Sequence, residues 1–145
     1  VTISYLSNNV LQKSLTSTLL VEDNELNMEI AEFVIQNEGA SVTKAWNGQE
    51  AVEIFKKSRP DEFDVILMDI MMPIKNGYEA AKMIRALDRD DAKTVPIIAM
   101  TANAFTEDRL KSKESGMNEH IAKPIDAKLL VKVISEFVEN KEEDS

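Results

Sequence analysis

The stretch VILMDIMMP, residues 65–73, joins an apolar run typical of a buried strand to an aspartate at the end of that run. A carboxylate at the edge of a core must be solvated, hydrogen-bonded or paired with a cation, because leaving it bare costs several kcal/mol. A loop containing Pro73 and Gly77 separates Asp69 from the next predicted helix, so this carboxylate has no helix to cap. We therefore expect a cation beside Asp69.

The composition is that of one ordered globular domain. The chain has 145 residues, 43% of them hydrophobic, with 4 Gly and 4 Pro, which suffices for a three-layer core. Its net charge of -9 disfavours nucleic acid and direct contact with a membrane, because its field repels phosphates. The absence of cysteine fits a cytoplasmic location. Since the chain begins at Val1 rather than Met, we expect a piece of a longer protein.

Strand and helix patterns alternate five times along the chain. Apolar runs typical of strands cover residues 18–21, 40–45, 65–69, 95–101 and about 120–122. Helical spacing follows each of them, over residues 24–39, 49–57, 78–87, 106–115 and from Asp126 onward. This alternation predicts a parallel sheet with helices on both faces, because parallel strands need crossover connections.

Several local interpretations follow from the same patterns. We expect Asn24 to cap the first helix and the charged segment 85–93 to be a solvated helix end and loop. Met71 and Met72 are expected to be exposed, unlike the methionines inside the apolar strands. The apolar residues assigned to the core face of the first helix are Leu26, Ile30, Phe33 and Val34.

Polar side chains end four of the five predicted strands. Glu22 and Asp23 follow the first strand, Asp69 ends the third, Thr101 the fourth and Lys123 the fifth. Taken singly, Asp23 could cap a helix, Lys123 could be a solvated surface residue, and Thr101 could be an ordinary strand residue. Because the carboxyl ends of parallel strands share one edge of the sheet, where ligands bind, their joint placement favours a functional site.

Such a cluster has a definite chemistry. Crowded carboxylates resist ionising together unless a cation joins them, and oxygen ligands without a Cys or His cluster favour Mg²⁺. Asp23 and Asp69 are the candidate direct ligands, with Glu22 acting through a water. If Asp69 attacks phosphorus, Mg²⁺, Lys123 and Thr101 could stabilise the charge of the resulting acyl phosphate.

Four segments of the chain resemble the signature segments of the receiver domain of two-component response regulators. The resemblance implies a flavodoxin-like doubly wound (βα)5 three-layer sandwich with a five-stranded sheet of order 2-1-3-4-5. It covers roughly residues 18–140, which leaves 1–17 as a linker or upstream remnant and 141–145 as an acidic tail. Within this family, the sequence is most similar to the receivers of hybrid sensor histidine kinases. The four segments are LLVEDNELN (19–27), VILMDIMMPIKNGYEA (65–80), PIIAMTANAF (96–105) and HIAKPID (120–126).

The resemblance implies a role for each rim residue. Asp69 would be the phosphoacceptor, taking a phosphoryl group from a phosphohistidine on a partner. Asp23 and the main-chain carbonyl of Met71 would join Asp69 around Mg²⁺, with Glu22 in the outer coordination shell. Lys123 would contact the phosphoryl group.

The resemblance also implies a switch. The Thr101 hydroxyl would turn toward the phosphoryl group after transfer, and Pro124 would follow a cis peptide bond that aims Lys123. His120 stands where many family members carry Tyr or Phe, so it is either part of this switch or a plain surface residue. Met71 has no polar side chain to position an attacking water, which predicts a long-lived phosphoryl group.

The expected partner is a histidine kinase dimerisation domain or a histidine phosphotransfer protein. We expect no enzyme activity beyond catalysis of the domain's own phosphorylation and slow dephosphorylation, with the domain forming part of a histidine kinase chain. The output is expected to be phosphorelay or protein contact.

Three other readings share parts of this pattern. An aspartate-nucleophile phosphatase needs an acid two residues after its nucleophile, but Met71 holds that position after Asp69. Glu25 holds the same position after Asp23, but it falls within the start of a predicted helix and lacks the other motifs of that class. A flavin module needs a phosphate-binding first loop, which EDNEL would repel. A vestigial interaction module would lack an acceptor, metal or lysine position, and none is missing here.

Overall fold

The computed structural model describes residues 16–102, 106–123 and 125–144. All paired strands run parallel, in the order β2-β1-β3-β4-β5, which confirms the α/β class and the predicted strand order. The strands are β1 (Ser17–Val21), β2 (Ser41–Ala45), β3 (Val65–Asp69), β4 (Ile97–Thr101) and β5 (Glu119–Ala122).

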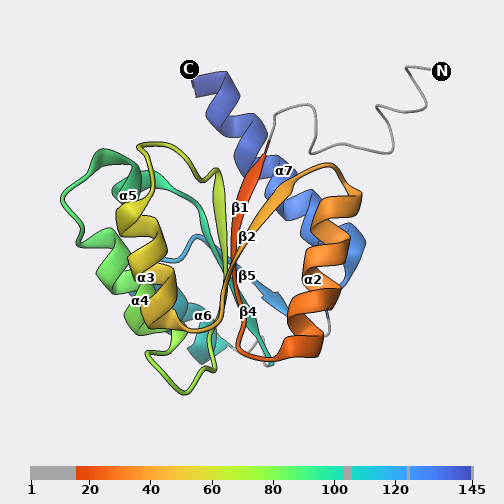
Figure 1. Cartoon of the computed structure of the whole chain (residues 1–145), viewed down its shortest axis with the longest axis horizontal. Coiled ribbons are helices and arrows are strands. Elements are labelled where there is room, and N and C mark those ends of the chain that lie inside the picture. The colour runs from red at the N-terminus through yellow and green to blue at the C-terminus, as the bar shows by residue number, and fades with distance from the viewer. Residues whose placement is uncertain (1–15, 103–105, 124, 145) are drawn as a thin grey trace.

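Helices cover both faces of this sheet (Figure 1). The helices are α2 (Glu25–Asn37), α3 (Gly48–Lys57), α4 (Gly77–Arg85), α5 (Asp90–Thr94), α6 (Thr106–Glu114) and α7 (Ala127–Asp144). Figure 1 shows α2 and α7 on one face and the other four on the opposite face. Residues 141–144, expected to be an acidic tail, continue α7. Over the described residues, no helix is both long and apolar enough to cross a bilayer.

The sheet separates two hydrophobic clusters. One cluster lies between the sheet and α3, α4 and α5, and includes Phe55 and Ile84. The other lies between the sheet and α2 and α7, and includes Met28 and Leu130. Every residue of β3 and β4 is buried, as expected for central strands that are covered on both faces.

Short polar residues start the helices at the carboxyl edge of the sheet. Asn24, Asn47 and Asn76 each accept a hydrogen bond from the backbone N–H three residues further on, at 2.9, 2.8 and 3.0 Å. Asp126 does the same for the start of α7, accepting from the backbone N–H groups of the second and third residues that follow it. These caps satisfy amide groups that a helix leaves open, and the predicted cap at Asn24 is confirmed.

The predicted core face of α2 is wrong. Leu26, Ile30 and Phe33 are 64, 46 and 70% exposed, and Val34 is only partly buried. Two apolar stripes with helical spacing run along this helix, so periodicity alone does not select between them. The stripe that faces the sheet consists of Met28, Ala31 and Ile35.

The charged segment 85–93 was expected to be a solvated helix end and loop. Its first residue does end α4, but the expected loop is wrong, because the segment contains most of α5 and an ordered arginine. The Arg89 guanidinium donates to the carbonyl oxygens of Phe55 at 2.8 Å and Ser58 at 3.0 Å. It also pairs with Asp91 at 2.7 Å and lies 4.8 Å from the centroid of the Phe55 ring. Arg89 therefore satisfies carbonyls at the carboxyl end of α3 and ties that end to α5.

Replacing this arginine should destabilise the fold. We expect Arg89→Ala to lower the free energy of unfolding by about 1–3 kcal/mol, because several carbonyls and Asp91 lose a shared donor. Urea unfolding followed by circular dichroism measures the change. Arg59→Ala is the matched control: the Arg59 side chain is 88% exposed and pairs with Glu62, so it should cost less than about 0.5 kcal/mol. Equal losses in the two variants would contradict the proposed role of Arg89.

Candidate functional site

Three carboxylates meet at the carboxyl edge of the sheet, between β1 and β3. Glu22 and Asp23 directly follow β1, and Asp69 is the last residue of β3. One oxygen from each of the three lies within 4.8 Å of the others. Glu22 and Asp69 are only 1 and 2% exposed, whereas Asp23 is exposed. The structure thus brings together the acids that the sequence placed at one edge.

Lys123 is the cation that the sequence requires beside Asp69. Its Nζ lies 2.9 Å from Glu22 Oε2 and 3.2 Å from Asp69 Oδ1. Burial by itself would lower the pKa of Lys123, but the hydrogen bond to Glu22 and the negative charge of Asp69 outweigh burial and raise it. Lys123 therefore stays charged and holds the two buried carboxylates together.

One ammonium does not neutralise three acids. Burial first, and the Glu22 carboxylate second, raise the pKa of Asp69 from 3.8 to about 7, even though Lys123 acts to lower it. The rim therefore has an excess of negative charge. The atoms that could bind a metal here are all carboxylate oxygens, which lie close together and are open to solvent on the Asp23 side. Such a set of ligands suits a hard divalent ion such as Mg²⁺.

The loop after β3 holds the Asp69 carboxylate in place. The Met71 N–H donates to Asp69 Oδ1 at 3.2 Å, and the Gly77 N–H donates to the carbonyl of Ile70 at 3.0 Å. A Cβ at Gly77 would lie 2.5 Å from the Asp69 carbonyl oxygen, so this close approach of α4 requires glycine. Met71 is 74% exposed, as expected, but the expectation for Met72 is wrong because Met72 packs into the core.

Thr101 lies beside Lys123 at the same edge. Thr101 ends β4, is 6% exposed and pairs in register with Ala122. The Lys123 N–H donates to the Thr101 carbonyl oxygen at 2.7 Å. The backbone therefore fixes these two residues next to each other. Pro124 lies outside the described residues, and with it the expected cis peptide bond.

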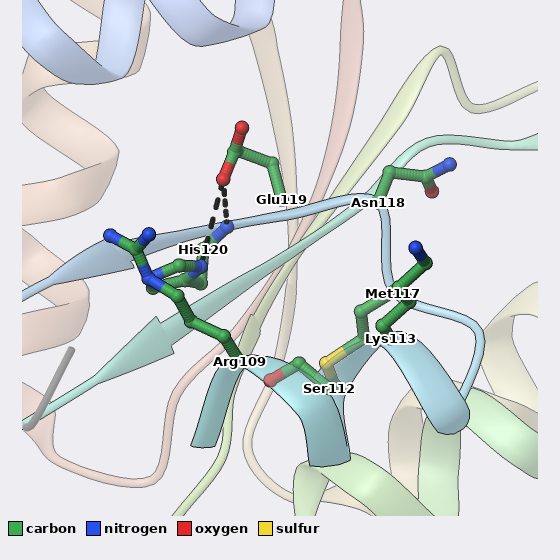
Figure 2. A pocket seen from close by; sticks show the side chains of 7 residues that line it. All are labelled: Arg109, Ser112, Lys113, Met117, Asn118, Glu119 and His120. Carbon is green, nitrogen blue, oxygen red and sulfur yellow. Dashed lines mark hydrogen bonds and ion pairs between the residues drawn. The ribbon is translucent and has the colours of Figure 1, made fainter. Parts of the chain in front are cut away.

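His120 lies against Arg109 of α6 (Figure 2). Arg109 Nε donates to His120 Nε2 at 2.8 Å. His120 Nδ1 lies 3.6 Å from Glu119 Oε1. Sequence reasoning missed Arg109, because no sequence spacing tells which residue of α6 packs against β5. A switch role for His120 stays a prediction.

Together these features define a flavodoxin-like α/β domain with an acid-rich rim and a lysine. The chain matches the family model of the response regulator receiver domain over residues 18–135, and it belongs to that family. It is therefore a signalling domain of two-component systems.

Its relatives include whole histidine kinases and small single-domain regulators. The chain is 40% identical over 126 residues to hybrid signal transduction histidine kinase M of Dictyostelium discoideum, covering 86% of this chain and 5% of that protein. It is 34% identical over 122 residues to the polar-differentiation response regulator DivK of Brucella anthropi, covering 84% of this chain and 95% of that protein. The chain thus spans a small part of the kinases that it matches.

Solved receiver structures superpose well on this chain. The receiver domain of sensor histidine kinase PA1611 from Pseudomonas aeruginosa, solved with a magnesium ion coordinated in its active site cleft, has a TM-score of 0.76 and 36% identity, covering 85% of this chain and 97% of that one. A co-crystal structure of the Saccharomyces cerevisiae histidine phosphotransfer protein Ypd1 with the Ssk1 receiver has a TM-score of 0.77 and 35% identity, covering 84 and 88%.

The raised pKa of Asp69 predicts a pH-dependent stability. Between about pH 4 and 7 the folded metal-free protein keeps a proton on Asp69 that the unfolded chain releases, so stability falls as pH rises through this window. Asp69→Asn removes this effect and should be more stable than the wild type at pH 8, by about 1–3 kcal/mol. Urea unfolding with a chelator, at pH 5 and pH 8, measures the difference.

Two controls accompany this comparison. Asp88→Asn, at an exposed position, should behave as the wild type at both pH values. Added Mg²⁺ should narrow the gap between the wild type and Asp69→Asn, because the ion stabilises the native carboxylates. An Asp69→Asn protein less stable than the wild type at pH 8 would show that carboxylate crowding does not dominate this site.

Proposed function

We propose that Asp69 accepts a phosphoryl group from a phosphohistidine on a partner protein. The observation that carries the proposal is the placement of Asp69: a buried carboxylate at the end of β3, 3.2 Å from the Lys123 ammonium and next to two further acids. Membership of the receiver family supports the same role. The domain would catalyse its own phosphorylation and slow dephosphorylation, and the expected cytoplasmic location stays a prediction.

Several side chains of the rim would contribute to phosphoryl transfer in different ways. Asp69 Oδ1 accepts hydrogen bonds that orient it, from Lys123 and from the Met71 N–H, while Oδ2 is the oxygen that these donors leave for attack. As the bond from Oδ2 to phosphorus forms, the bond from phosphorus to the imidazole nitrogen breaks, and the histidine leaves with the electron pair. Lys123 and the Thr101 hydroxyl would then stabilise the charge on the transferred oxygens.

A bound Mg²⁺ would fit the acidic rim. Asp23, Asp69 and the Met71 carbonyl would hold the ion directly, and Glu22 would act through a water, since Glu22 is already engaged by Lys123. When bound, the ion supplies positive charge to the phosphoryl oxygens.

The exposed apolar face of α2 supports the proposal of a docking surface for the partner. Leu26, Ile30 and Phe33 form this face, and Ile30 also lines a small pocket with Lys123 and Ile125. The α2 face is therefore continuous with the phosphorylation rim. We propose that it receives an amphipathic helix of a histidine phosphotransfer protein or kinase dimerisation domain, which lays its own apolar side on α2.

The side chain of Met71 bears on how long the phosphoryl group lasts. Met71 is two residues beyond Asp69 and 74% exposed, and its thioether is too weak an acceptor to hold an attacking water. We therefore propose that the acyl phosphate is long-lived in this domain.

Phosphorylation by a small donor tests the acceptor. With acetyl phosphate and Mg²⁺, intact-mass spectrometry should show one alkali-labile phosphoryl group on the wild type and none on Asp69→Asn. Lys123→Ala should be phosphorylated at least about tenfold more slowly, because the charge on the transferred oxygens loses its ammonium. The control Asp88→Asn should be labelled as the wild type is. Full labelling of Asp69→Asn would refute the assignment.

If the partner docks on α2, substitutions there should slow phosphorylation by a protein donor but not by a small-molecule donor. We expect Phe33→Ala and Ile30→Ala to slow transfer from phosphorylated Ypd1, used as a probe, by about fivefold or more, because truncating interface anchors typically costs over about 1 kcal/mol. Labelling by acetyl phosphate should not change. Met83→Ala is the matched control: Met83 is 39% exposed but lies on α4, on the opposite face of the sheet. Equal slowing in Met83→Ala would refute α2 as the docking face.

The proposed long lifetime gives a further prediction. Met71→Asn places an amide near Asp69 that can hold a water, so its phosphoryl group should be lost faster than that of the wild type, by about threefold or more. The loss is followed by intact-mass spectrometry after the donor has been removed. Rapid loss from the wild type, unchanged in Met71→Ala, would contradict the role given to this side chain.

A further inference from the structure

The seven methionines of the chain differ sharply in exposure. Five are nearly inaccessible, Met83 is 39% exposed and Met71 is 74% exposed. Oxidation of a thioether requires contact between its sulfur and the oxidant, so exposure ranks the methionines by reactivity. Met71 is therefore the first site at which this domain would be oxidised. The five buried methionines are Met28, Met68, Met72, Met100 and Met117.

The most exposed methionine is also the one next to the proposed phosphoacceptor, Asp69. The Met71 N–H donates to Asp69 Oδ1 at 3.2 Å, so its side chain starts from the backbone that touches the acceptor carboxylate. Met83 lies on α4, away from the rim. A chemical change on the Met71 sulfur would thus alter the surroundings of Asp69, whereas the same change at Met83 would not.

Oxidation reverses the chemical property on which the long lifetime depends. The Met71 sulfur donates an electron pair to one oxygen of hydrogen peroxide, the O–O bond breaks, and the products are methionine sulfoxide and water. The sulfoxide oxygen is polar and accepts hydrogen bonds, unlike the thioether, and reductases restore the thioether. A hydrogen-bond acceptor at position 71 can hold a water near the phosphorus atom.

We propose that Met71 is a site of reversible oxidation by peroxide that shortens the life of the phosphoryl group on Asp69. The proposal rests on the proposed function and adds a redox input to it. Because a sulfoxide holds a water but does not take its proton, we expect acceleration of about three- to tenfold, below the ~10²–10⁴-fold typical of a general base.

The test has two readouts. Purified wild type is treated with limiting hydrogen peroxide, and peptide mapping identifies the methionines that gain oxygen; Met71 should be oxidised before Met83. Treated and untreated samples are then labelled with acetyl phosphate and Mg²⁺, and loss of the phosphoryl group is followed after the donor is removed. The treated sample should lose it three to ten times faster, and methionine sulfoxide reductase should restore the original rate.

Matched variants assign the effect to one sulfur. In Met71→Leu the rates with and without peroxide should be equal, whereas Met83→Leu should keep the full response. Met71→Gln, which carries a permanent carbonyl oxygen near the position of the sulfoxide oxygen, should lose its phosphoryl group quickly without peroxide.

Two results would overturn the proposal: oxidation of Met83 before Met71, or complete oxidation of Met71 with an unchanged rate. If the untreated wild type takes no phosphoryl group at all, the proposed function fails and the lifetime effect with it. The peptide map would still show by itself whether Met71 is the preferred site of oxidation.

Discussion

A single ammonium shared by two buried carboxylates organises the rim of this domain. Lys123 reaches both Glu22, which follows β1, and Asp69, which ends β3. It therefore joins three segments that are distant in sequence. Without it, burial and the Glu22 carboxylate would push Asp69 further toward its neutral form. With it, the rim still has more negative than positive charge, and Asp69 keeps a raised pKa. This excess of negative charge makes the rim receptive to a further cation.

The parallel sheet brings these groups together without long excursions of the chain. Each strand ends at the same edge, and asparagine or aspartate caps start four of the helices there within a few residues. Gly77 lets α4 begin against the backbone of Asp69 itself. Because short capped connections have few alternative conformations, the distances between the rim residues are set largely by the fold.

The sequence predicted the strands and the rim because both leave strong local signals. A run such as residues 65–69, apolar at every position before its aspartate, has few interpretations other than a central strand. The side of α2 that faces the sheet had no such signal, because Leu26 and Met28 begin two equally regular apolar stripes. The bonds of Arg89 with α3 and of Arg109 with His120 depend on how helices pack in three dimensions. No spacing along the chain encodes those contacts, so residues 85–93 were predicted to be a solvated helix end and loop.

The two ends of the described chain leave the domain away from its rim. Strand β1 starts at the amino edge of the sheet, and α7 runs back from Lys123 toward the same side, where Figure 1 places the carboxyl end. A segment joined at either end would therefore start on the side of the domain opposite Asp69. A tether of this kind could present the domain to a covalently linked donor at a high effective concentration, so that even a weak encounter between the two would be frequent.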